Sequence, residues 1–118
     1  MMTMGPPALE MLAALGRKRR FVHVGLNFRR ILPAPAVKTI HNCVQAYLDT
    51  LGGDWYRYAA QNYVVWTEKD PASLSREITQ QPGLTNIYVL ATEFNPSPYT
   101  ANGMMPKVFW DWLHKQRI

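Results

Sequence analysis

The feature that most constrains the fold is Phe21–Phe28, FVHVGLNF, in which apolar side chains recur at every second position. One side of this stretch carries only apolar residues, namely Val22, Val24, Leu26 and Phe28. A period of two residues is typical of a β-strand that buries one face, whereas a helix repeats about every 3.6 residues. We therefore expect a sheet, and the apolar side of this strand is suited to packing against helices.

Further elements follow this strand, each with its own start or stop signals. In chain order they are a helix over Pro35–Leu51, strands over Trp55–Tyr58 and Tyr63–Thr67, a short helix from Asp70-Pro71 to about Pro82-Gly83, a strand over Asn86–Phe94, a loop over 95–103 and a helix from Pro106. Aromatic and β-branched residues favour strands, a proline after a capping aspartate favours a helix start, and glycine favours a helix end. This order predicts an α+β, ferredoxin-like βαββαβ fold. It has a four-stranded antiparallel sheet, two helices on one face and a C-terminal helix.

The chain of 118 residues is long enough for one domain with its own core, and we assign this domain to residues 21–118. Residues 1–20 are expected to form a flexible or weakly helical basic arm, with leucines about one turn apart over Ala8–Leu15. The single cysteine, Cys43, excludes an intrachain disulfide framework. The single cysteine also suits a reducing compartment, so we expect a cytoplasmic protein. No apolar run approaches the ~20 residues of a membrane span, so we expect no membrane partner.

The net charge of +5 belongs entirely to the first 30 residues, which hold six of the 13 Lys and Arg and one of the eight Asp and Glu. From residue 31 onward the two signs balance. A basic segment of this kind predicts a polyanionic partner, RNA or single-stranded DNA. The candidate contacts are Arg17, Lys18, Arg19, Arg20, Arg29, Arg30 and Arg57. The alternative, a solvated basic turn ahead of the first strand, stays open.

Aromatic side chains gather on the predicted hairpin and the fourth strand, but two helices cover only one face of the sheet. A buried Trp or Tyr hides ~150–250 Å², which contributes at most about 4–6 kcal/mol per ring at ~25 cal/mol per Å². Exposing several of them would forgo stabilisation comparable to that of a whole fold. We therefore expect a partner subunit, or the last helix with Phe109, Trp110 and Trp112, to cover the second face. The candidate interface residues are His23, Trp55, Tyr56, Tyr58, Trp66 and Tyr88. Stacking on single-stranded nucleic acid is the rival role for these rings.

Residue types with metal-binding or catalytic potential are scattered along the chain. His41 and Cys43 lie two residues apart on a predicted helix, so their side chains diverge and cannot share a metal ion. The sequence contains no phosphate-binding loop, no G-x-S-x-G and no C-x-x-C. Residues 61–65 lack the glycine and the basic residue that an RNA-recognition motif carries on its third strand. The sequence therefore predicts no catalytic residue, no metal site and no cofactor.

Four segments form a recognisable pattern: the hairpin DWYRYAAQNYVVWT, the stretches EKDPASLSREI and NIYVLATEF, and a tail that ends in WDWL. Over roughly residues 21–115 this pattern resembles a group of small bacterial and phage proteins, some of them labelled SinR-family. The resemblance implies a ferredoxin-like core and a setting in bacterial or phage defence or in toxin–antitoxin systems. It implies no particular activity.

More distantly, the layout is similar to the superfamily of CRISPR-adaptation endonucleases, VapD toxins and the GhoS antitoxin. The first two types resemble dimers with an aspartate at the end of the first strand, where two copies could hold a divalent metal. Asn27 stands there in this chain, and its amide is a poor substitute for a carboxylate that binds Mg²⁺. Only acids outside this motif, such as Asp54 or Glu93, could replace it.

The leading prediction is a non-catalytic, homodimeric binding module. The alternatives are RNA or single-stranded DNA binding through the basic arm, and a Mg²⁺-dependent endoribonuclease of the CRISPR-adaptation type.

Overall fold

The computed structural model describes residues 18–97 and 102–117 of the chain. Its elements are β1 (Arg20–Phe28), α2 (Ala34–Asp49), β2 (Asp54–Ala59), β3 (Asn62–Thr67), α3 (Pro71–Thr79), β4 (Ile87–Phe94) and α4 (Lys107–His114). The strands form one sheet in the order β2-β3-β1-β4, and every neighbouring pair is antiparallel. This arrangement confirms the α+β, ferredoxin-like fold with a C-terminal helix. The helix predicted over Ala8–Leu15, and Arg17 of the basic arm, lie outside the described residues.

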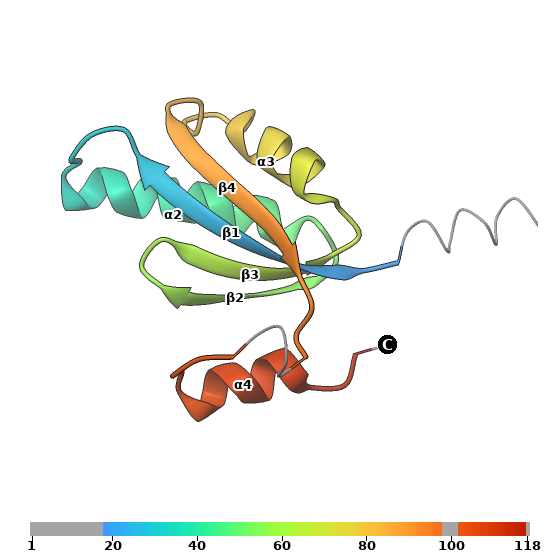
Figure 1. The fold of residues 1–118 in the computed structure, drawn as a ribbon. Coiled ribbons are helices and arrows are strands. Elements are labelled where there is room, and N and C mark those ends of the chain that lie inside the picture. The colour runs from blue at the N-terminus through green and yellow to red at the C-terminus, as the bar shows by residue number, and fades with distance from the viewer. Residues whose placement is uncertain (1–17, 98–101, 118) are drawn as a thin grey trace, which may run out of the picture.

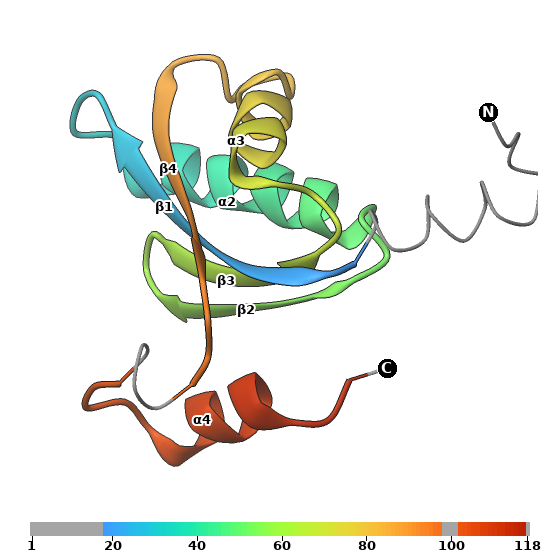
Figure 2. The same cartoon turned by 45° about the vertical axis from the view of Figure 1, so that its right-hand side comes forward.

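The molecule has three layers, with α2 and α3 on one face of the sheet and α4 on the other (Figures 1 and 2). The layer between the sheet and α2 and α3 is the main core. Its buried members are Val22, Val24, Leu26, Val44, Tyr47, Leu48, Tyr63, Val65, Leu74, Ile78, Leu84 and Ile87. The apolar side of β1 therefore faces the helices as its alternation predicted, because Val22 and Val24 pair with Val65 and Tyr63 of β3.

The second layer lies between the sheet and α4. Phe109 and Leu113 of α4 pack on Phe21 and Val64 of the sheet, and all four side chains are buried. Their partly buried neighbours are Tyr56, Tyr58, Trp66, Phe94, Met105, Trp110 and Trp112. Of the two covers expected for the aromatic face, the chain's own last helix is the one that lies there.

The C-terminal end of α4 is held to the start of β2 by Arg117. Its side chain, only 9% exposed, donates to the carbonyl oxygen of Trp112 at 2.7 Å and lies over the Trp112 ring, 4.5 Å from the ring centroid. Asp54 forms ion pairs with Lys115 at 2.7 Å and with Arg117 at 3.5 Å. Burial raises the pKa of Asp54, but hydrogen bonds from Lys115 and Trp112 outweigh it, so the net pKa is lowered.

Local signals set most of the element boundaries. Asp70 caps α3, since its Oδ1 accepts a hydrogen bond from the backbone N–H of Ser73 at 2.7 Å. Gly52 follows α2 with a φ of 71°, and a Cβ at Gly53 would collide with the carbonyl oxygen of Trp66. Both glycines are therefore needed where the chain turns from α2 into β2.

Candidate nucleic-acid interface

The structure separates the predicted basic contacts into two groups at opposite ends of β1. Lys18 and Arg19 precede this strand and Arg20 begins it, whereas Arg29 and Arg30 follow its last residue. A strand of nine residues spans about 30 Å at ~3.3 Å per residue. The basic residues therefore form two surfaces rather than the single one that the arm suggested.

The surface at the start of β1 is mixed in charge. Arg20 forms an ion pair with Glu93 at 3.2 Å, and Arg19 donates to the carbonyl oxygen of Gly52 at 3.1 Å. Asp49 ends α2 and Asp54 begins β2, on either side of the Gly52 that Arg19 contacts. Glu93 and Asp49 offset part of the positive charge of this end, whereas Asp54 is paired with Lys115 and Arg117.

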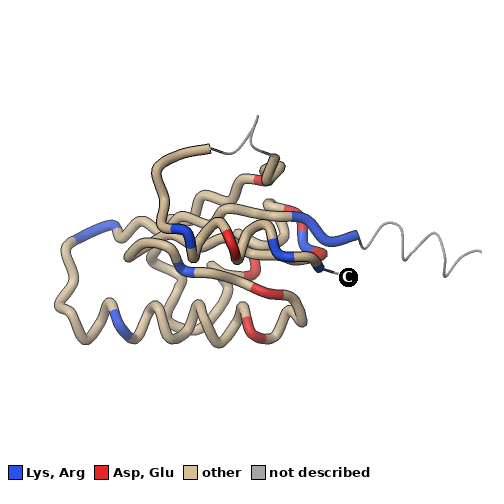
Figure 3. Tube along the Cα trace, turned by 90° about the horizontal axis from the view of Figure 1, so that it is seen from below, with Lys and Arg blue, Asp and Glu red and all other residues tan. Residues whose placement is uncertain are grey.

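The opposite surface, which we call the basic end, consists of Arg29, Arg30, Lys38 and Arg57. It forms because the end of β1, the start of α2 and the β2–β3 hairpin meet there. The backbone N–H of Leu26 donates to the Gln61 carbonyl of the turn at 2.9 Å, and Lys38 of α2 and Arg57 of β2 line one hollow. In Figure 3 the end of the molecule formed by the loop after β1 and the start of α2 has blue segments and no red ones. The basic end is thus a cationic surface without acidic neighbours among the described residues.

Lys38 belongs to this surface although the sequence did not single it out. It lies in the second turn of α2 and lines a hollow of about 530 Å³ together with Arg57 and Leu32. Arg57 comes from β2 and donates to the Ala60 carbonyl of the adjacent turn at 2.6 Å. No local pattern in the sequence marks this pair, because only the fold brings α2 beside the hairpin.

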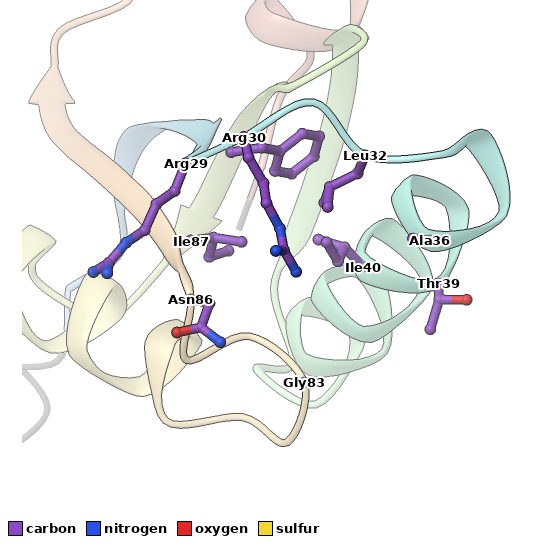
Figure 4. A pocket seen from close by; sticks show the side chains of 10 residues that line it. Arg29, Arg30, Leu32, Ala36, Thr39, Ile40, Gly83, Asn86 and Ile87 are labelled. Carbon is purple, nitrogen blue, oxygen red and sulfur yellow. The ribbon is translucent and has the colours of Figure 1, made fainter.

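A second hollow, of about 640 Å³, opens between the β1–α2 loop, α2 and the start of β4 (Figure 4). Arg29 and Arg30 line it, and Arg30 extends across it between Ile40 and Ile87. Leu32 also lines this hollow. Leu32 also lines the Lys38–Arg57 hollow and a third hollow, of about 450 Å³, beside the β2–β3 turn. No Asp or Glu lines any of the three, and each is lined by apolar side chains and by at least one Lys or Arg.

One exposed aromatic ring lies beside the basic end. Tyr88 of β4 is 55% exposed, and the guanidinium of Arg29 lies 4.5 Å from its ring centroid. Tyr88 pairs with Asn27, which is exposed on the neighbouring strand. A ring and a guanidinium in this arrangement offer a stacking surface next to the other cations of the basic end.

The positive charge of the basic end affects a buried histidine, His41. His41 is 3% exposed, and its Nδ1 lies 2.6 Å from the hydroxyl of Tyr63. Burial lowers the pKa of His41, and the nearby positive charge of Arg57 lowers it further. His41 is therefore neutral at pH 7, and its role is to satisfy the buried Tyr63 hydroxyl rather than to add charge.

The six predicted interface residues are divided between three places. His23, Tyr56, Tyr58 and Trp66 lie on the face that α4 covers, and Tyr88 lies beyond α4 at the basic end. Trp55 points to the other face, where it packs against the main core and donates to Asp49 at 2.8 Å. The homodimer stays a prediction, but α4 now accounts for the burial of most of these rings.

The two acids proposed for metal binding lie far apart. Asp54 is on β2 and Glu93 on β4, the two edge strands, and three strand spacings of ~4.8 Å separate them by about 14 Å. Each is engaged in an ion pair, with Lys115 and Arg20 respectively. These two carboxylates therefore cannot bind one ion within a single chain.

Fold and surface together define a class: a small ferredoxin-like domain with helices on both faces of its sheet and a cationic surface at one end of β1. No family model, curated protein or solved structure matches the chain. The resemblance to SinR-family-labelled proteins, and the defence or toxin–antitoxin setting, accordingly stay predictions. Within residues 18–97 and 102–117, no helix has the length and apolar character to cross a bilayer.

Proposed function

We propose that the protein is a non-catalytic module that binds single-stranded nucleic acid at its basic end. The observation that carries the proposal is the separation of charge along β1, which leaves Arg29, Arg30, Lys38 and Arg57 together with no acidic residue lining the hollows around them. Phosphate groups supply most of the affinity of such surfaces, through Lys and Arg. The basic arm, by contrast, leads into the end of the sheet where Arg20 is already paired with Glu93.

A single strand is favoured over a duplex by the side chains between the cations. Unpaired bases stack on exposed aromatic rings and on guanidinium planes. Tyr88 with Arg29 over its ring supplies such a pair, and the hollow beneath Arg30 has an apolar floor of Phe28, Ile40 and Ile87. A duplex keeps its bases stacked inside and would use only the cations.

The number of cations sets the expected salt dependence. Four phosphate contacts give log K a slope of about −3 against log salt concentration for a single strand. Between 50 and 200 mM salt the affinity should then fall about 50-fold. A slope near zero would mean that phosphates are not the main contacts.

The test compares two variants that remove the same charge from the two ends of β1. One carries Arg29→Gln, Arg30→Gln, Lys38→Gln and Arg57→Gln; the other carries Arg17→Gln, Lys18→Gln, Arg19→Gln and Arg20→Gln. Binding of a fluorescein-labelled oligouridine and oligothymidine of about 12 nucleotides is followed by anisotropy at low salt. Circular dichroism checks that both variants fold.

We expect the basic-end variant to lose at least tenfold in affinity and the arm variant to lose less than threefold. The reverse order would assign binding to the arm and overturn the proposal. Absence of binding by the unmodified protein at low salt would overturn nucleic-acid binding at either end. A labelled duplex that binds as tightly as the single strands would refute the stacking part of the argument.

A further inference from the structure

A groove of about 520 Å³ lies between α4 and the sheet, at a distance from the basic end. All four strands contribute to its floor, and α4 with the segment before it forms the other wall. Its volume falls within the ~300–1,000 Å³ that is typical of small-molecule sites. The groove exists because α4 leaves part of the sheet face uncovered between Phe109 and β4.

The walls of the groove are aromatic and apolar. Phe94 and Val64 line it from the sheet, and Phe109, Trp110 and Leu113 line it from α4. Rings on both walls suit a flat guest, which can stack offset or edge-on against them. Met104 and Met105 complete the rim, and the flexible thioether side chain of methionine adapts to guests of different outline.

The polar groups of the groove are neutral. His23 and Tyr58 join across the floor, with 2.6 Å between His23 Nε2 and Tyr58 Oη. Burial lowers the pKa of His23 and raises the pKa of Tyr58, so both are uncharged at pH 7. Thr92 adds a hydroxyl, and no Lys, Arg, Asp or Glu lines the groove.

The lining of the groove therefore disfavours charged ligands. A phosphate or carboxylate placed here would lose its hydration without gaining a cation, and this costs several kcal/mol or more. An uncharged ring that carries one hydrogen-bonding atom loses little, because the His23–Tyr58 pair can turn a donor or an acceptor toward it.

We propose that this groove is a binding site for an uncharged, planar aromatic heterocycle of about two fused rings, hydrogen-bonded at the His23–Tyr58 pair and stacked against α4. The site is independent of the basic end, since it shares no lining residue with the hollows there. Its ligand is a free small molecule without phosphate groups.

The test uses indole and quinoline as uncharged probes, one with a ring N–H donor and the other with a ring nitrogen acceptor. Indole-3-acetate serves as the charged counterpart of indole. Binding is followed by NMR on protein labelled at the methionine methyl groups, because Met104 and Met105 line the groove. The other four methionines of the chain serve as internal references.

Two phenylalanine substitutions on the same face of β4 form the matched pair of variants. Thr92→Phe places a ring in the groove, whereas Leu90→Phe adds one two residues along the strand, where Leu90 is 67% exposed and outside the groove. A third variant, His23→Phe, removes the polar floor and keeps a ring there, and it replaces Thr92→Phe if that protein does not fold.

We expect at least one uncharged probe to shift the Met104 and Met105 signals saturably at submillimolar to low millimolar concentration. Thr92→Phe and His23→Phe should each weaken binding at least tenfold, Leu90→Phe less than twofold, and indole-3-acetate should bind at least tenfold more weakly than indole. The proposal is overturned if no probe gives a saturable shift, if the groove variants bind as well as Leu90→Phe, or if charge makes no difference.

Discussion

Replacement of Phe109 by alanine removes the central side chain between α4 and the sheet. Phe109 is 8% exposed, and its ring lies 5.5 Å from Tyr58, 5.9 Å from Tyr56 and 5.1 Å from Trp110, between ring centroids. The side chain therefore joins both halves of the second hydrophobic layer. If this layer stabilises the fold, truncation here should have a large effect.

The expected loss follows from burial. A Phe→Ala change at a buried site costs about 3–5 kcal/mol, and the two ring contacts to the sheet place Phe109 toward the middle of this range. A domain of this size has about 5–15 kcal/mol in total. With a urea m-value of about 2 kcal/mol per M, a loss of 4 kcal/mol lowers the unfolding midpoint by about 2 M.

Urea unfolding followed by tryptophan fluorescence measures this directly, because Trp66, Trp110 and Trp112 all belong to the second layer. Val108→Ala is the control, since Val108 is on the same helix but 59% exposed. The Val108→Ala midpoint should correspond to a change in the free energy of unfolding of less than about 0.5 kcal/mol. Equal midpoints for the two variants would refute the reasoning, because α4 would then contribute nothing to covering the aromatic face.

Three further outcomes are expected. Arg117→Leu should lower the free energy of unfolding by about 2 kcal/mol in urea melts, since it breaks buried charged hydrogen bonds at the end of α4; an unchanged melt contradicts this role. Burial lowers the pKa of His23 and His41 below 6.5 in the folded protein, so the unfolded chain binds protons first and stability should fall as pH drops below about 6.5. A variant with both histidines changed to Gln should lose most of this slope, and an unaltered pH profile would count against it. The predicted homodimer should double the mass in light scattering and revert to a monomer with Leu90→Lys, because Leu90 is 67% exposed on an edge strand; a monomer at every concentration rejects the dimer.

Most of the fold could be predicted because its signals are local. The alternation in β1, the Asp70 cap and the Gly52-Gly53 turn each act over a few residues, and each appears in the structure as expected. The need to cover the aromatic face was also predictable, since the area of the rings is a property of composition. Which element covers this face could not be predicted, because the choice between α4 and a second subunit depends on how the chain returns to the sheet after β4.

The candidate site was only partly predictable. Arg29 and Arg30 are adjacent in sequence, but Lys38 and Arg57 join them through the packing of α2 beside the β2–β3 turn. The charge count correctly located the excess in the first 30 residues, yet the fold divides these residues between two ends. The neutralisation of Arg20 by Glu93 links positions 73 residues apart and has no signature in the sequence.

The most direct test of nucleic-acid binding at the basic end is a titration of ¹⁵N-labelled protein with an oligouridine of about 12 nucleotides, followed by NMR at low salt. We predict shifts concentrated at Arg29, Arg30, Lys38, Arg57 and Tyr88 that diminish as salt is raised. Shifts concentrated at Lys18–Arg20, or an unchanged spectrum at saturating oligonucleotide, would contradict the account.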